Sequence, residues 1–265
     1  MKKKYYVIIS NDDGIFSAGI RALYEALEPI AEVLIAAPDR QRSGASHAIS
    51  VDSIITAESV PFGKGRGFAV SGTPADCAKL ALFTLAKRKP DLFISGINHG
   101  PNMAQFILYS GTVGAAAEAA ILGIPAMAFS VDDYKPEDFS FCVSYIRQVA
   151  LNVLEKRIRI KKHSLLNINI PYRQEGHIKG VKMLPKGLLE YGEKYILDKK
   201  RKGKNKSYFW HITGRTRKRK GEPATDADGL EKGYITVTSL SFDLNDRKYM
   251  NKLGTKGFEI KKGGF

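Results

Sequence analysis

Two adjacent carboxylates follow the first predicted strand of this chain. An apolar run at residues 5–10 is followed by Asn11, and Asp12 and Asp13 then come directly before Gly14. The run is short and rich in β-branched and aromatic residues, which predicts a buried strand. Two carboxylates at the end of such a strand repel each other unless a cation or hydrogen-bond donors compensate their charge. A hard divalent cation does so most simply, although one Asp would suffice to cap the following helix.

Two further polar loops follow predicted strands. Ser43 lies in a loop after the strand at residues 31–37, and Asn98 follows the strand at residues 92–95. In an open parallel sheet the carboxyl ends of the strands share one edge, where ligands bind. Carboxylate, hydroxyl and amide oxygens suit Mg²⁺ or Mn²⁺. Zinc favours Cys and His ligands, which this set lacks. Judged singly, Ser43 and Asn98 are turn residues.

The segment Ser110-Gly111-Thr112 enters an alanine-rich helix predicted for residues 112–122. Backbone N–H groups and hydroxyls at a helix start favour phosphate binding, and Asn102 in the preceding loop could donate to a phosphate oxygen. Helix capping alone is the alternative. The chain has neither a Walker loop nor a GxGxxG motif after its first strand, which argues against an ordinary dinucleotide site. His99, beside Asn98, is a candidate proton donor or a loop histidine with no role.

Strands and helices alternate through the first 170 residues. This order predicts an α/β fold with a Rossmann-like, mostly parallel sheet and helices on both faces. A weakly alternating stretch at 47–59 predicts an irregular strand. The remaining predicted strands are 68–70, 126–130 and 165–170, and the predicted helices are 19–27, 73–85, 112–122 and 136–157.

The pattern changes after Pro171. Residues 176–220 alternate weakly and carry runs of Lys and Arg, which predicts long hairpins or a projecting arm with a mobile tip at 199–204. Another strand is predicted at 234–238. We therefore divide the chain into an α/β core with the metal and phosphate site at 1–171, and a C-terminal extension at 172–265. The extension holds the basic arm and a closing strand, and we expect it to mediate oligomerisation.

The net charge of +15 belongs to the C-terminal part of the chain. Residues 1–150 hold 14 basic and 15 acidic side chains, whereas residues 151–265 hold 28 and 12. A basic region attracts polyanions such as RNA, so an RNA-binding module with a structural Asp pair is the alternative function. A solvated lysine-rich surface is the simpler explanation. Two cysteines without a CxxC motif, and no apolar run long enough to span a bilayer, lead us to expect a cytoplasmic protein.

Many short segments, in order along nearly the whole chain, resemble the survival protein SurE family of metal-dependent nucleoside monophosphate phosphatases. The first is Ser10-Asn11-Asp12-Asp13-Gly14, and the others are Ala37-Pro38-Asp39-Arg40, Ser43-Gly44-Ala45-Ser46, Gly72-Thr73-Pro74-Ala75-Asp76-Cys77, Ser95-Gly96-Ile97-Asn98-His99-Gly100-Pro101-Asn102, Tyr109-Ser110-Gly111-Thr112-Val113, Leu166-Asn167-Ile168-Asn169-Ile170-Pro171 and Gly233-Tyr234-Ile235-Thr236-Val237-Thr238.

The resemblance implies that one divalent cation, Mg²⁺ or Mn²⁺, is held by Asp12, Asp13, Ser43 and Asn98. It implies that phosphate is held by Asn102, Ser110, Gly111 and Thr112. It also implies a homodimer or homotetramer that exchanges C-terminal elements.

We expect hydrolysis of nucleoside 5′-monophosphates, and of 3′-monophosphates as further candidates, with Asp12 and Asp13 as the catalytic pair. The attacking group is either a water activated by the metal or one of the two carboxylates. Polyphosphate and short oligonucleotides are candidate secondary substrates, and we expect neither a membrane partner nor a stable nucleic-acid complex.

Overall fold

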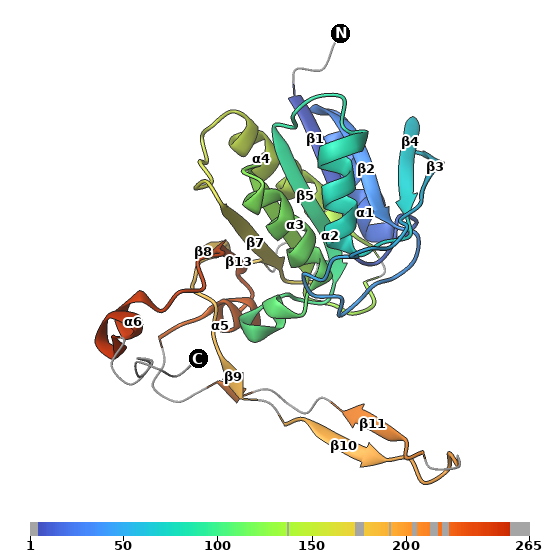
Figure 1. The fold of residues 1–265 in the computed structure, drawn as a ribbon. Helices are drawn as coiled ribbons and strands as arrows, with labels where there is room; N and C mark the ends of the chain where they lie inside the picture. Colours follow the sequence, from blue (N-terminus) through green and yellow to red (C-terminus); the bar gives the residue numbers. More distant parts are fainter. Residues whose placement is uncertain are drawn as a thin grey trace, which may run out of the picture.

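A nine-stranded sheet forms the body of the molecule (Figure 1). The computed structural model describes residues 5–136, 138–172, 178–190, 192–202, 206–212, 217–218 and 223–254. The strand order is β3-β4-β2-β1-β5-β6-β7-β13-β8. The bounds are β1 Tyr5–Ser10, β2 Ala31–Pro38, β3 Ala57–Phe62, β4 Gly65–Val70, β5 Leu92–His99, β6 Ala126–Val131, β7 Ser164–Ile170, β8 Val181–Met183 and β13 Ile235–Ser241.

The predicted α/β fold with a mostly parallel sheet is confirmed. Strands β4, β2, β1, β5, β6 and β7 are parallel to their neighbours, whereas β3 is antiparallel to β4 and β13 is antiparallel to β7. From β1 the chain first moves outward through β2, then returns to β5 on the other side of β1 and continues outward to β7. The strand order therefore reverses between β1 and β5, which is where open α/β sheets bind their ligands.

Helices cover both faces of the sheet and enclose two hydrophobic cores. Helices α1 (Ala18–Leu27) and α4 (Ser140–Leu154) bury Leu23 and Ile146 in the larger core. Helices α2 (Pro74–Leu80) and α3 (Gly111–Ile121) pack on the opposite face, where α3 contributes mainly alanines. Small side chains let α3 approach the strands closely, so its first turn lies near the end of β1.

Three boundaries differ from the sequence prediction. Helix α4 begins at Ser140, after its N-cap residue Phe139, and the Asp138 carboxylate accepts a hydrogen bond from the Ser140 N–H (2.8 Å) at this end. It ends at Leu154, short of the predicted residue 157. The predicted helix at 73–85 changes after Leu80 into a π-helical turn over Ala81–Leu85, whose last bond joins Ala86 N to Ala81 O at 2.9 Å.

The irregular strand predicted at 47–59 is wrong over most of its length. Regular structure begins only at Ala57, where β3 starts. The preceding residues form no ladder, because Ala48 O and Ser50 N bond to the start of α2 instead. The polar loop expected from residue 96 is also shorter. Strand β5 continues to His99, and a 3₁₀ helix, η2, spans Ala104–Leu108.

The projecting arm is confirmed as antiparallel hairpins, but the predicted range 176–220 is too long, because β8 within it pairs with β13 in the main sheet. Strand β10 (Lys194–Leu197) pairs with β11 (Phe209–Ile212), and β9 (Leu189–Glu190) pairs with β12 (Arg217–Lys218) nearer the body. Figure 1 shows β10 and β11 extending far from the sheet. The mobile tip expected at 199–204 lies partly outside the described residues. Helices α5 (Asp226–Glu231) and α6 (Arg247–Leu253), which the sequence reasoning missed, follow the arm.

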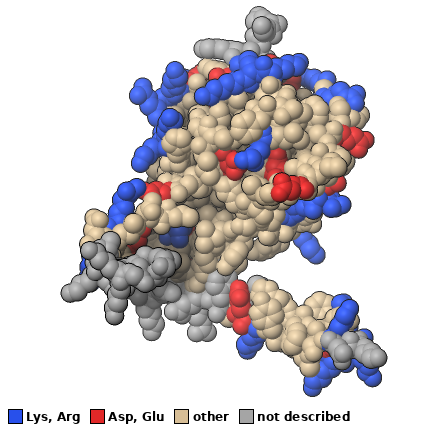
Figure 2. Space-filling model, viewed as in Figure 1, with Lys and Arg blue, Asp and Glu red and all other residues tan. Residues whose placement is uncertain are grey.

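Basic side chains lie on the surface of the molecule, whereas both cysteines are buried. On the face shown in Figure 2, Lys and Arg side chains lie along the periphery of the body and on the arm, and they do not form one continuous patch. Cys77 and Cys142 are both buried free thiols. Within the described residues, no helix combines the length and the apolar character needed to cross a bilayer.

Candidate functional site

The Asp pair lies in a tight turn that begins at the end of β1. Asn11 stabilises this turn, since its Nδ2 donates to Gly14 O (3.0 Å) and to Ser17 Oγ (2.8 Å). Gly14 has a φ of +96°, and a Cβ there would lie 3.1 Å from the backbone carbon of Arg40. The turn therefore requires glycine. It brings Asp12 and Asp13 to the carboxyl edge of the sheet, at the point where the strand order reverses.

Asp12 is in direct contact with the start of α3. The Thr112 hydroxyl donates to Asp12 Oδ1, and the Asp12 residue is only 4% exposed. A Cβ at Gly111 would lie 2.8 Å from Asp12 Cβ, so only glycine allows this approach. The positive end of a helix dipole thus faces a buried carboxylate. A phosphate held at the same helix start would be adjacent to any cation bound by Asp12.

Burial makes the charged forms of both carboxyls unfavourable. It raises the pKa of Asp12 to about 6, with the Thr112 hydrogen bond opposing the shift and neighbouring Asp13 adding to it. Burial also raises the pKa of Asp13, while nearby His99, whose N–H lies 3.4 Å from Asp13 Oδ2, lowers it. Among the described residues, neither carboxylate forms an ion pair with Lys or Arg. Apart from nearby His99, which lowers the pKa of Asp13, the described residues supply no cation to this pair.

Asn98 lies at this site, whereas no hydrogen bond among the described residues joins the Ser43 side chain to it. Asn98 Oδ1 lies 3.3 Å from Thr112 Oγ1, and Asn98 Nδ2 donates to Gly100 O (2.6 Å). This bond leaves the amide oxygen on the side of Thr112. Ser43 is exposed, and its hydroxyl accepts from Gln41 Nε2 at 2.8 Å. Its neighbour Arg42 is tied to the site, because Arg42 N donates to Asp12 O at 2.6 Å.

The predicted phosphate binders lie around the start of α3. Ser110 is the N-cap, and its Oγ accepts from Val113 N at 3.0 Å. The early backbone N–H groups of α3, from Gly111 and Thr112, have no partner within the helix. Asn102 is 7% exposed and lies deeper, where its Nδ2 donates to Ser130 Oγ on β6 (2.8 Å).

The residues that position Asn102 were missed from the sequence. Asn167 and Asn169, on β7, both donate to Asn102 O (2.7 and 3.0 Å), and Asn169 Oδ1 accepts from Asn102 N at 2.8 Å. Asp226, which is fully buried on α5, accepts from Ala104 N at 2.9 Å. Asn167 and Asn169 alternate with apolar residues in the predicted strand. Buried asparagines of this kind need hydrogen-bond partners, so this pattern could have indicated the pair from the sequence.

The donor set fits a hard divalent cation. The buried Asp12 carboxylate and the half-buried Asp13 lie at this edge, and Thr112 Oγ1 joins Asp12 to the Asn98 amide oxygen. The exposed Ser43 follows Arg42, whose N–H donates to Asp12 O. In the described part of the chain no three His, Cys, Asp or Glu side chains gather as a metal cluster. An ion at this edge would therefore depend on neutral oxygens as well as on the Asp pair. That combination suits Mg²⁺ or Mn²⁺ and does not suit zinc.

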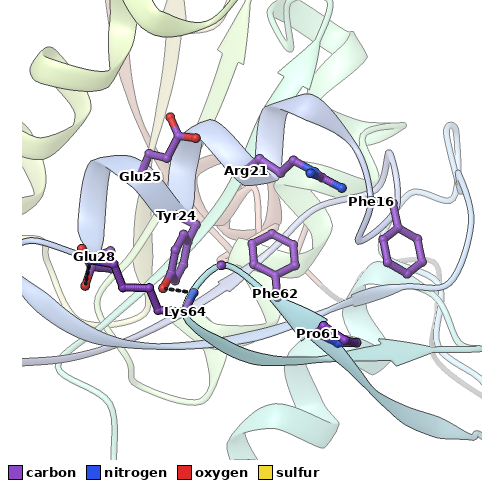
Figure 3. Close-up of a pocket in the computed structure, with 9 residues that line it drawn as sticks. Phe16, Arg21, Tyr24, Glu25, Glu28, Pro61, Phe62 and Lys64 are labelled. Carbon is purple, nitrogen blue, oxygen red and sulfur yellow. Dashed lines mark hydrogen bonds and ion pairs between the residues drawn. The ribbon is translucent and has the colours of Figure 1, made fainter.

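An apolar pocket elsewhere is separate from this edge. It has a volume of about 440 Å³ and lies along α1, between this helix and β3 (Figure 3). Phe16, Tyr24 and Phe62 line it, with Arg21 and Lys64 among the charged neighbours, and none of the predicted site residues contributes to it. The candidate site is thus the polar sheet edge, which small charged ligands favour over an apolar pocket.

The sheet topology is that of an α/β protein whose candidate site lies at the carboxyl edge of a mostly parallel sheet, where the strand order reverses. Residues 7–193 match the family model described as "Survival protein SurE". The chain therefore belongs to the survival protein SurE family, as the sequence segments predicted.

Similar proteins extend over nearly the whole chain. The "5'-nucleotidase SurE" of Christiangramia forsetii is 38% identical over 258 residues, which cover 96% of this chain and 97% of the relative. The protein of the same name from Pelotomaculum thermopropionicum is 41% identical over 249 residues, covering 93% of each. The crystal structure of "Sure Protein from Aquifex aeolicus" superposes with a TM-score of 0.79 at 34% identity, covering 94% of this chain and 98% of that one.

One segment joins Ser43 to two helices. Residues 42–50, which we call the strap, run from Arg42 to Ser50. Asp76 on α2 accepts from Ser50 N (2.9 Å), from Ser50 Oγ (2.7 Å) and from Thr73 N (2.9 Å). Burial alone would raise the pKa of Asp76, but these hydrogen bonds outweigh it and hold the pKa below the ordinary 3.8. The ionised Asp76 therefore stabilises the folded strap.

We predict that Asp76→Asn lowers the free energy of unfolding by roughly 1–3 kcal/mol at neutral pH, because a buried acceptor of three hydrogen bonds is impaired. The folded pKa lies below the unfolded one, so this stabilisation is present above the unfolded pKa. It is lost as the pH falls below about 4. Urea unfolding of wild type and variant across this range measures the difference. A difference that stays constant with pH would contradict the charge-based explanation.

Proposed function

We propose that this protein is a phosphomonoester hydrolase that converts nucleoside 5′-monophosphates to nucleoside and phosphate, with 3′-monophosphates as further candidates. Membership of the SurE family and the similarity to proteins named 5′-nucleotidase support this proposal. The single observation that carries it is the contact between Asp12 and the first turn of α3. It supports the proposal because carboxylate oxygens, which suit a cation, lie next to a helix start, which suits a phosphate.

The candidate residues divide into two groups in this proposal. One divalent cation, Mg²⁺ or Mn²⁺, is held by Asp12, Asp13, Asn98 and Ser43, and when bound it supplies charge stabilisation for the phosphoryl oxygens. The N–H groups of Gly111 and Thr112 at the start of α3 bind the remaining phosphate oxygens, with the Ser110 hydroxyl and the Asn102 amide nearby.

The two carboxylates have different surroundings, which suggests different roles. Asp12 is nearly inaccessible, and one of its oxygens is occupied by the Thr112 hydroxyl, so it is suited to a fixed ligand. Asp13 is less buried, and its one hydrogen bond within the described chain, from His99 N, is long at 3.4 Å. We assign two roles to Asp13: it orients the attacking group, and it accepts the proton of that group. The raised pKa of Asp13 favours proton acceptance.

We predict that Asp12→Asn and Asp13→Asn each reduce kcat/KM for nucleoside 5′-monophosphates by at least about a hundredfold, since each removes a charge from the proposed cation site. Phosphate release from a panel of mononucleotides measures the effect. Asp52→Asn is the matched control, because Asp52 is exposed and lies in a turn with φ +50°, which Asn also tolerates. Near-normal turnover by either site variant, with circular dichroism unchanged, would exclude the assignment.

Chelation tests the cation separately from its ligands. We expect EDTA to abolish phosphatase activity and added Mn²⁺ or Mg²⁺ to restore it, because no Lys or Arg of the described chain compensates the Asp pair. The measurement is p-nitrophenyl phosphate hydrolysis after dialysis against chelator, with each ion titrated back. Activity that survives exhaustive chelation would show that catalysis needs no divalent cation.

We further propose a homodimer or homotetramer formed through the arm. The β10–β11 hairpin exposes apolar side chains on both faces, since neighbouring positions point to opposite sides. Exposed fractions are 68% for Tyr195, 47% for Leu197, 59% for Phe209 and 56% for Trp210. A two-stranded ribbon is marginally stable in water by itself, so such faces favour burial against a second copy of the chain.

We predict that replacing Leu197 and Phe209 together by Ser yields monomers, because these residues pair across the hairpin and form one apolar face. Light scattering after size-exclusion chromatography should give two or four times the chain mass of 29.3 kDa for the wild type and about one chain mass for the variant. Lys194→Ser, on the same strand, is the control and should leave the assembly intact. An unchanged mass for the double variant would exclude the arm as the interface.

A further inference from the structure

The strap carries Ser43 but has no regular secondary structure, so its position depends on side-chain contacts. Among the described residues the Ser43 hydroxyl bonds only with Gln41, and the next side-chain hydrogen bond of the strap lies three residues further on, at Ser46. At Ser46 the strap reaches the segment before α3, because Ser46 Oγ donates to Leu108 O (2.6 Å) and Ser46 N to Tyr109 O (3.1 Å). A Cβ at Gly114 would collide with Ser46 O, so the strap lies directly on α3.

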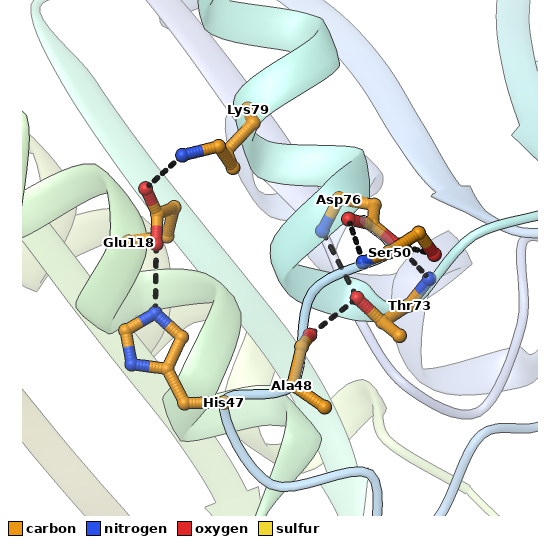
Figure 4. Close-up of polar contacts among 7 residues, drawn as sticks. All are labelled: His47, Ala48, Ser50, Thr73, Asp76, Lys79 and Glu118. Atoms are coloured by element: carbon orange, nitrogen blue, oxygen red, sulfur yellow. Dashed lines mark hydrogen bonds and ion pairs between the residues drawn. The ribbon is translucent and has the colours of Figure 1, made fainter. Parts of the chain in front are cut away.

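A buried carboxylate at the middle of α3 holds the next residue of the strap. The Glu118 side chain is 9% exposed, and its Oε2 lies 2.8 Å from His47 Nε2. Its other oxygen, Oε1, accepts from Lys79 Nζ on α2 at 3.1 Å. Figure 4 shows Glu118 between His47 and Lys79, with one interaction on each side. Both carboxylate oxygens are therefore satisfied, which a buried charge requires.

The second half of the strap is fixed to α2 alone. Thr73 Oγ1 donates to Ala48 O (2.7 Å), and Asp76 accepts both bonds from Ser50 (Figure 4). His47 consequently supplies the only side-chain hydrogen bond between the described strap and the body of α3. Helix α3 also contains Gly111 and Thr112, which touch Asp12. The His47–Glu118 contact thus joins the loop that carries one proposed cation ligand to the helix that positions another.

We propose that His47 and Glu118 are positioning residues for the cation site: their contact holds the strap on α3, so that Ser43 stays near the carboxyl edge. The neighbouring Arg42 N–H reaches this edge, where it donates to Asp12 O at 2.6 Å. This inference rests on the proposed function, in which Ser43 contributes to cation binding. A contact that merely stabilises the fold would change the unfolding temperature and leave the affinity for the cation unaltered. Positioning of a ligand by an outer residue instead affects the affinity itself.

The test is direct Mn²⁺ binding to the full-length protein without substrate, followed by the electron paramagnetic resonance signal of free Mn²⁺. We expect H47A and E118Q to raise the Kd for Mn²⁺ about tenfold or more. H47Q, whose amide can donate to Glu118, should bind more tightly than H47A. At saturating Mn²⁺, kcat of H47A should approach the wild-type value, because the residues that contact substrate are unchanged. His163→Ala, a substitution of a histidine outside the strap, should have no effect.

The outcomes separate the two proposals. Mn²⁺ binding by the wild type that is lost in D12N but unchanged in H47A, H47Q and E118Q would overturn the positioning role and leave the proposed cation site intact. Absence of Mn²⁺ binding in the wild type would overturn both. Should H47A fail to fold, H47Q and E118Q decide the question, since both keep a polar side chain that fills the same space.

Discussion

The contact between Asp12 and the first turn of α3 constrains the rest of this structure. A buried carboxylate beside a second one is unfavourable without compensation, and here it faces a helix start, the Thr112 hydroxyl and the Gly111 backbone. The approach requires glycine at 111 and small residues along α3. It also requires β1 and β5 to be neighbours, so that the loop after β5 leads into α3 beside the end of β1.

A buried polar network continues from this contact across the sheet edge. Asn167 and Asn169 of β7 fix the backbone of Asn102, and Ser130 of β6 accepts from its side chain. Asp226 then fixes Ala104, in the same loop. Each group in this chain of contacts is held through partners distant in sequence. Asn167 Oδ1 is buried without a hydrogen-bond partner among the described residues, but the bonds to Asn102 favour one geometry of its loop, which the proposed phosphate site requires.

The sequence predicted the parts of the fold that rest on local patterns. Apolar runs such as 5–10 and 92–95 gave the central strands, and the Ser110-Gly111-Thr112 segment predicted the start of α3. The stretch at 47–59 was predicted wrongly because its backbone partners are Thr73 and Asp76, far along the chain. Glu118 in an alanine-rich helix gave no sign of its contacts with His47 and Lys79, which only the tertiary fold creates.

The closing strand β13 follows the arm in the chain yet pairs with β7 inside the main sheet. The arm is therefore an insertion between two segments that both belong to the body. These segments meet where Asp226 Oδ1 accepts a hydrogen bond from Gly187 N at 3.0 Å. A short turn could bridge that gap. The arm can consequently become longer, shorter or differently charged in evolution without altering the strand order of the sheet. Relatives can thus differ in their assemblies while the sheet edge stays the same.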